Sequence, residues 1–191
     1  MAHRWGIDPA AGERMRRRAL MALACSMVLA CSMAITGMTG HAQAHERVLL
    51  TEQHTSASRG PILADGTIAR AAFASFDRVG QRRGLRVQFT AGQQVRMELL
   101  IPDSPPANRL PQAQLPEVVV IAPDGSRSTM RTSERTPFFE PYSGTSYLYL
   151  ARLRQTALTG TYRVLVTSRS TTPVTAVIGI GYREVAGHGS R

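Results

Sequence analysis

The aromatic side chains of this 191-residue chain are concentrated in one short stretch. Five of them fall within twelve residues, namely Phe138, Phe139, Tyr142, Tyr147 and Tyr149. Aromatic faces close to carboxylate and guanidinium groups can hold a sugar, a peptide or an acidic polymer. We therefore predict a ligand-binding site whose residues are Glu140, Tyr142, Tyr147, Tyr149, Arg152 and Arg154. The alternative is a structural role, in which Phe139 and some of the tyrosines are buried in the core.

A second cluster consists of arginines around a turn that contains Gly80. Its members are Arg78, Arg82, Arg83 and Arg86. Guanidinium groups in this arrangement could bind phosphate or carboxylate groups of lipopolysaccharide, of a wall polymer or of nucleic acid. The alternative is a solvated basic surface. Because the sequence contains no nucleic-acid-binding module, we do not expect nucleic acid as a partner.

Three histidines could ligate a metal ion. If the chain is cleaved after Ala44, His45 becomes the N-terminus, and its amine and imidazole could chelate copper together with His54 or His188. The alternative is that His45 follows the cleavage point by chance. We therefore predict no metal site and no cofactor, and keep a copper-binding protein as the second hypothesis.

Hydrolytic chemistry has little support in the sequence. Neither a G-x-S-x-G nor an H-E-x-x-H motif is present, and no histidine lies within a predicted strand. A pair of carboxylates remains as the basis of a third hypothesis, a small hydrolase, and its candidates are Glu117, Glu134 and Glu140. We predict no catalytic residue.

Composition excludes further classes of chemistry. The chain contains no lysine, which removes Schiff-base and P-loop lysine mechanisms, and its net charge is +10. Its two cysteines, Cys25 and Cys31, both precede residue 45, so the rest of the chain has neither a disulfide nor a thiolate nucleophile.

The first 44 residues have the pattern of a signal peptide. Arg16–Arg18 precede an apolar run over residues 19–35, and the small residues of Ala42-Gln43-Ala44 form a cleavage site. We therefore expect a periplasmic or extracellular protein without a stable membrane span after cleavage. Three alternatives remain open: a true start at Met15, a lipoprotein anchored at Cys31, and an uncleaved anchor.

Beyond the signal peptide, alternation of apolar and polar residues predicts an all-β domain. It is clearest in Leu85–Thr90, Val95–Ile101 and Tyr162–Thr167, and Leu100 is the only breach in the second run. The linker 91–94 is short enough for a hairpin between the first two runs. The continuous apolar run Glu117–Ala122 is typical of a fully buried strand.

We expect seven or eight strands arranged as an antiparallel β-sandwich or jelly roll over residues 62–185. Residues 45–61 are predicted to be a flexible arm, and residues 186–191 a flexible tail. The predicted core residues are Val87, Phe89, Val95, Met97, Leu99, Val119, Ile121, Tyr162, Val164, Val166 and Ile178.

Four segments together are similar to a known class of protein. They are Leu99–Asp103, Phe138–Tyr142, Gly160–Val164 and Ile178–Glu184. In combination they resemble small exported bacterial β-sandwich proteins akin to pre-peptidase C-terminal domains. The resemblance implies a jelly-roll-like fold and an accessory or binding role outside the cytoplasm. The leading hypothesis is therefore an exported, noncatalytic β-sandwich that binds an envelope component or another protein, and its oligomeric state is left open.

Overall fold

The computed structural model describes residues 46–185. The predictions for the signal peptide, Met15, Cys31, His45, His188 and the tail lie outside these residues. The strands are β1 (Glu46–Leu50), β2 (Ile62–Leu63), β3 (Arg70–Phe76), β4 (Arg82–Phe89), β5 (Gln94–Pro102), β6 (Glu117–Ile121), β7 (Arg127–Met130), β8 (Thr136–Glu140), β9 (Thr145–Thr156), β10 (Gly160–Thr167) and β11 (Val174–Ile180). Two short 3₁₀ helices, η1 (Ala107–Arg109) and η2 (Gln112–Gln114), interrupt the segment between β5 and β6.

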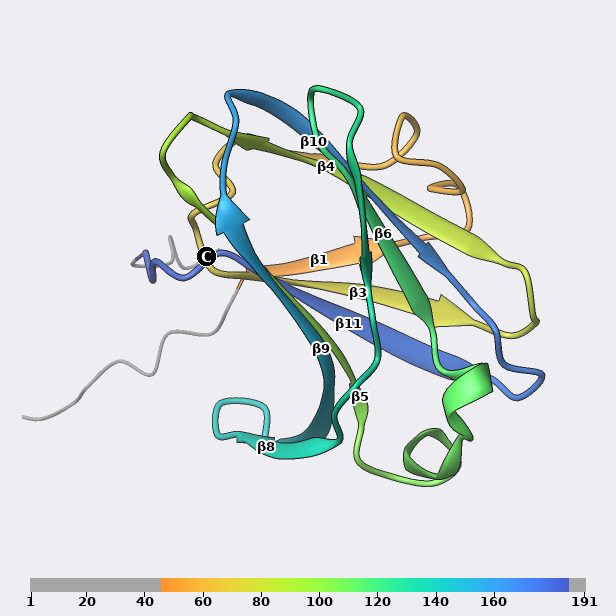
Figure 1. Ribbon diagram of the computed structural model, residues 1–191. Helices are drawn as coiled ribbons and strands as arrows, with labels where there is room; N and C mark the ends of the chain where they lie inside the picture. Colours follow the sequence, from red (N-terminus) through yellow and green to blue (C-terminus); the bar gives the residue numbers. More distant parts are fainter. Residues whose placement is uncertain (1–45, 186–191) are drawn as a thin grey trace, which may run out of the picture. The chain divides into compact units, whose positions relative to one another are not determined.

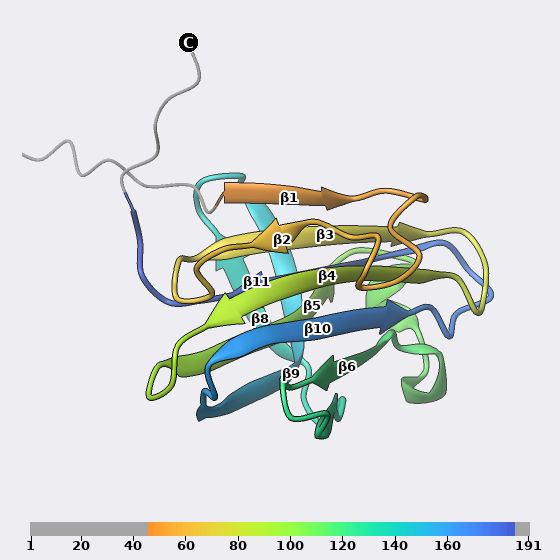
Figure 2. The same ribbon diagram turned by 90° about the horizontal axis from the view of Figure 1, so that it is seen from above.

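The strands form two sheets that pack face to face (Figures 1 and 2). One sheet has six strands in the order β1-β3-β11-β5-β9-β8, and the other has five in the order β2-β4-β10-β6-β7. The predicted fold class, an all-β sandwich, is confirmed. The described residues contain eleven strands rather than seven or eight. The additional strands are short and lie at the edges of the sheets.

The described part of the predicted arm, residues 46–61, contains a strand and a loop that contact the sheets. Residues 46–50 form β1, which pairs in parallel with β3, and Leu50 is buried in the core. The following loop lies against β4, where the backbone N–H of Gly84 donates to the carbonyl of His54 over 2.7 Å. A Cβ atom on Gly84 would lie 2.4 Å from the backbone nitrogen of Ala57, so only glycine permits this close approach.

The turn over residues 91–94 does not form the expected hairpin. β4 pairs with β2 and β10, whereas β5 pairs with β9 and β11, so this turn connects the two sheets. It is held by the loop between β9 and β10, since the N–H of Ala157 donates to the carbonyl of Gln93 over 2.8 Å and Gly92 donates to Ala157. Two alternating strands joined by a short linker therefore need not be neighbours in one sheet.

The core lies between the sheets and contains residues from both. The rings of Phe89 and Tyr162 meet edge to face with centroids 5.3 Å apart. Nine of the eleven predicted core residues are buried. Val119 and Ile121 are the exceptions, because β6 buries Val118 and Val120 instead. A run that is apolar on both faces carries no period-two signal, so the sequence did not reveal which face points inward.

No helix within residues 46–185 is long and apolar enough to cross a membrane.

Candidate functional site

A groove of about 510 Å³ crosses the outer face of the six-stranded sheet. Its floor consists mainly of small or aliphatic residues, namely Ala71, Leu100, Val177 and Gly179. On one side lie Arg47, Arg70 and Phe73, from β1 and β3. On the other lie Phe138, Tyr142, Tyr147 and Tyr149, from the β8–β9 hairpin. We call this feature the tyrosine groove.

Strand register places these side chains on one face. Within β3, Ala72 and Ala74 are buried in the core, and the alternate residues Ala71 and Phe73 therefore point into the groove. Across β5 and β9, Leu100 is paired with Tyr149, after a register shift that gives β9 one extra residue. Leu100 faces away from the core and is nevertheless only 6% exposed, which shows how well the groove side chains cover the floor.

Contacts among the side chains stabilise both sides of the groove. The rings of Phe138 and Tyr149 lie 5.2 Å apart, centroid to centroid, and the Arg152 guanidinium lies 4.2 Å from the Tyr149 centroid. On the other side, the Arg47 guanidinium lies 4.5 Å from the Phe73 centroid. Each side therefore combines an aromatic ring with a cation.

A carboxylate, that of Glu98, also lines the groove. Burial raises the pKa of the Tyr149 hydroxyl above its ordinary value, and the nearby negative charge of Glu98 and a hydrogen bond to it raise this pKa further. Arg152 lies opposite Glu98 in the β5–β9 register, but its Nε is 3.3 Å from the Glu134 carboxylate. Glu98 and Tyr149 thus form a polar pair within an otherwise largely apolar groove.

Four of the six predicted site residues line the tyrosine groove, namely Glu140, Tyr142, Tyr147 and Tyr149. Arg152 and Arg154 are not among the lining residues, although the Arg152 guanidinium lies over the ring of Tyr149. Glu140 also shapes the β8–β9 turn, because its carboxylate accepts hydrogen bonds from the N–H groups of Tyr142, over 3.0 Å, and Ser143, over 2.7 Å.

Phe139 is not buried in the core, where the structural alternative placed it. Phe139 is 59% exposed and does not line the groove. Its strand, β8, is the edge strand of the six-stranded sheet, and Phe138 is the residue that points toward Tyr149. Tyr142 is 63% exposed at the rim of the groove.

Sequence reasoning missed the groove residues that come from other strands, above all Phe73, Glu98 and Arg47. One signal was present in the sequence. Leu100 breaks the alternation of β5 by placing an aliphatic side chain on the polar face, and such a breach indicates that the outer face is covered at that point.

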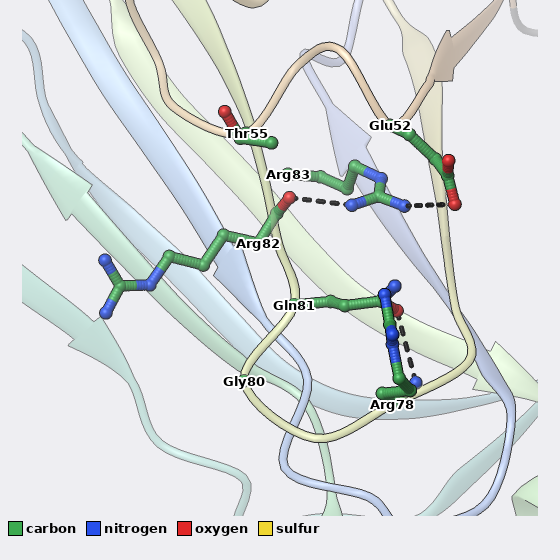
Figure 3. A pocket seen from close by; sticks show the side chains of 7 residues that line it. All are labelled: Glu52, Thr55, Arg78, Gly80, Gln81, Arg82 and Arg83. Carbon is green, nitrogen blue, oxygen red and sulfur yellow. Dashed lines mark hydrogen bonds and ion pairs between the residues drawn. The ribbon is translucent and has the colours of Figure 1, made fainter.

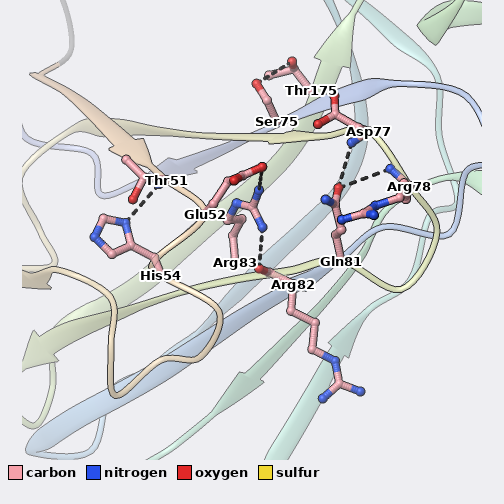
Figure 4. A network of polar contacts seen from close by, with 10 residues as sticks. All are labelled: Thr51, Glu52, His54, Ser75, Asp77, Arg78, Gln81, Arg82, Arg83 and Thr175. Carbon is pink, nitrogen blue, oxygen red and sulfur yellow. Dashed lines mark hydrogen bonds and ion pairs between the residues drawn. The ribbon is translucent and has the colours of Figure 1, made fainter.

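The arginine cluster is divided by the structure. A pocket of about 570 Å³ near the β3–β4 turn is lined by Arg78, Arg82 and Arg83 (Figure 3). Arg86 is not among its lining residues, and its Nη2 donates to the carbonyl of Gly60. Arg83 is only 4% exposed. The Arg83 guanidinium lies 4.0 Å from the Glu52 carboxylate and donates to the Arg82 carbonyl. The Arg82 guanidinium points away from Arg83 and Glu52 (Figures 3 and 4). These arginines therefore do not converge on one point.

The described residues bring together none of the other candidate sites. His54 accepts a hydrogen bond at Nδ1 from the N–H of Thr51 (Figure 4) and belongs to no cluster of metal-ligating side chains within residues 46–185. Of the carboxylates, Glu117 lies on the five-stranded sheet near Arg169, whereas Glu140 lies on the six-stranded sheet. Glu134 forms an ion pair with Arg152.

No family model and no curated protein matches the sequence. Among solved structures, the chain is similar to Aeromonas hydrophila PliG, a periplasmic inhibitor of g-type lysozyme, with 14% identity and a TM-score of 0.40 over 73% of this chain and 100% of that one. It is also similar to the pre-peptidase C-terminal domain of a Bacillus anthracis collagenase, with 6% identity and a TM-score of 0.35 over 72% and 97% of the two chains. A β-glucosidase from Paenibacillus barengoltzii matches with 10% identity and a TM-score of 0.28, over 71% of this chain but 13% of the enzyme.

Proposed function

We propose that this chain is an exported, noncatalytic protein that binds a segment of another protein in the tyrosine groove. The observation that carries the proposal is the gathering of aromatic rings on the outer face of a sheet, where packing of the core does not require them. Phe73 and Phe138 stand on opposite sides of the groove, and Tyr147 and Tyr149 line it beside Phe138. Aromatic residues, tyrosine above all, and arginine supply most of the binding energy in protein interfaces.

The shape of the groove supports a short extended segment as the ligand. Its volume of about 510 Å³ accommodates a few side chains rather than a folded domain. The small residues Ala71 and Gly179 on its floor leave room for a backbone to lie close to the sheet. Tyrosine hydroxyls along the side can then hydrogen-bond to peptide groups of the segment while the rings pack against its side chains.

The lining of the groove favours recognition, because aromatic and aliphatic side chains predominate in it. Glu140 shapes the adjacent turn. We therefore assign the groove to recognition.

Screening of a displayed library of random peptides on the immobilised protein tests this function. We expect enrichment of peptides that bind the wild-type protein in calorimetry and bind the Tyr147→Ala variant roughly ten-fold more weakly or worse. Phe139→Ala is the matched control, because Phe139 is an exposed aromatic outside the groove. Equal loss of binding in the control variant, or enrichment on a glycan array in place of peptides, would contradict the proposal.

Export is tested separately by N-terminal sequencing of the protein recovered from the producing cell. A first residue of His45 is the expected result. A chain blocked at Cys31 would instead identify a lipoprotein, and a chain that begins at Met1 or Met15 would contradict cleavage.

A further inference from the structure

We infer that the tyrosine groove selects a cationic side chain, that of an arginine or lysine in the bound segment, and that Glu98 is its counter-ion. This inference rests on the proposed function and specifies the chemistry of the ligand. It follows from four features of the groove: the surroundings of Glu98, the partners of the neighbouring arginines, the open floor at Gly179, and the aromatic rings beside the carboxylate.

Glu98 is a half-buried carboxylate that lines a largely apolar groove. No guanidinium within residues 46–185 lies at ion-pair distance from it. A carboxylate that is partly removed from water without a counter-charge favours the approach of a cation. A ligand cation therefore has a place in this groove that the described residues do not fill.

Four arginines of the six-stranded sheet have other partners. Arg70 forms an ion pair of 2.6 Å with Glu46, and Arg152 lies 3.3 Å from Glu134. Arg47 and Arg96 lie over the rings of Phe73 and Tyr182 at 4.5 and 4.8 Å. The negative charge of Glu98 is consequently not neutralised by a contact with any of them.

The floor next to Glu98 is open because residue 179 is glycine. A Cβ atom at this position would lie 3.5 Å from the Cβ of Glu98 and 3.6 Å from its Oε2, in ordinary van der Waals contact. The backbone of β11 therefore tolerates a side chain here, and the glycine leaves one side of the carboxylate uncovered. A ligand group can reach Oε2 through this space.

Aromatic rings complete the subsite. Tyr149 lines the groove together with Glu98, and both Phe138 and Tyr147 line the same side of the groove. A cation above such a ring is attracted by the negative face of the π system, and the attraction increases as water is excluded. A carboxylate beside several rings favours a guanidinium or ammonium group over a neutral or anionic one.

Binding of small defined peptides tests the inference. The probes are acetyl-Gly-Arg-Gly-amide, the same peptide with the uncharged isostere citrulline, and acetyl-Gly-Glu-Gly-amide, each titrated into the purified protein and followed by NMR of the backbone amides. We expect the arginine peptide to shift the amides of Glu98, Tyr149 and Gly179 and to bind roughly ten-fold more tightly than the citrulline peptide. The glutamate peptide should cause no saturable shift at these residues.

Two variants make the test specific. Glu98→Gln removes the negative charge with little change in side-chain size and should reduce the affinity for the arginine peptide to that for the citrulline peptide. Glu117→Gln makes the same change of net charge on the five-stranded sheet and should leave the affinity unchanged. Melting curves of both variants confirm that they are folded.

The outcomes separate this inference from the proposed function. Equal affinity for the arginine and citrulline peptides, equal losses in both variants, or no binding of the arginine peptide would overturn the selection of a cation. The proposed function still stands in those cases if peptides from the displayed library bind at Tyr147. If neither the library nor the defined peptides bind in the groove, both proposals fail.

Discussion

The ring of Phe138 lies 5.2 Å from the ring of Tyr149, centroid to centroid, and this contact attaches the edge strand β8 to the tyrosine groove. The strand register supports it, because Phe138 is paired with Tyr147 and Thr136 with Tyr149. β8 lies at the edge of its sheet and has hydrogen bonds to one neighbour only, so we infer that side-chain packing determines how firmly it is held.

We predict that Phe138→Ala lowers the free energy of unfolding by about 1–2 kcal/mol and loosens β8 locally. Hydrogen exchange of the β8 amides and urea unfolding measure the two effects. Phe139→Ala, one residue away and exposed, should change stability by less than about 0.5 kcal/mol. Similar losses from both substitutions would contradict this description of the edge strand.

Substitutions in the core should lower the free energy of unfolding more than Phe138→Ala does. Phe89 is buried between the sheets against Tyr162, so Phe89→Ala should destabilise the fold by about 3–5 kcal/mol. Leu99→Ala should destabilise it by about 2–5 kcal/mol, because Leu99 is fully buried. Urea unfolding monitored by circular dichroism provides both values, and a loss below about 1 kcal/mol at either position would argue against the sandwich core.

Two glycines on outer sheet faces should respond differently to alanine. Gly84→Ala places a Cβ 2.4 Å from the backbone nitrogen of Ala57 and should displace residues 51–61 from β4. We expect a lower melting temperature and faster proteolytic cleavage in this loop. Gly179→Ala meets only ordinary contacts and should leave the melting temperature nearly unchanged. Equal tolerance at both positions would contradict the close approach of the loop to β4.

Stability should decline at alkaline pH partly because of Tyr149. Its pKa is raised above the ordinary value of 10.0 by burial first and by Glu98 second. Since the folded state holds this proton more tightly than the unfolded state, its contribution is complete below the unfolded pKa and is lost as the pH rises through the folded pKa. Tyr149→Phe should therefore flatten the decline in melting temperature above about pH 10. Glu98→Gln should lower the pKa of Tyr149 in a spectrophotometric titration, and an unchanged titration curve would refute the coupling.

The parts of the fold that the sequence predicted correctly are those in which alternation reports a buried face. Val87 and Phe89 in β4, and Val164 and Val166 in β10, were assigned to the core for this reason and are buried there. The choice of partner strands was beyond reach, because a four-residue linker such as 91–94 can connect strands within one sheet or across two. Val119 and Ile121 in β6 were misassigned because both faces of that strand are apolar.

The candidate site was predicted only where its residues are close in sequence. Tyr142, Tyr147 and Tyr149 belong to one hairpin, so their concentration was visible along the chain. Phe73 and Glu98 reach the groove from β3 and β5, and β11 lies between those strands in the sheet. Their proximity depends on the strand order, which no local pattern contains.

The binding role of the tyrosine groove is tested most directly by comparing Tyr142→Ala and Tyr147→Ala with the wild-type protein. The two quantities to measure are the melting temperature and the calorimetric affinity for a peptide selected on the groove. Tyr142 is 63% exposed at the rim and Tyr147 lines the groove above a core that neither residue enters. We predict melting temperatures close to that of the wild-type protein and affinities roughly ten-fold lower or worse. A large drop in melting temperature, or an affinity that neither substitution changes, would contradict the assignment of the tyrosine groove as the binding site.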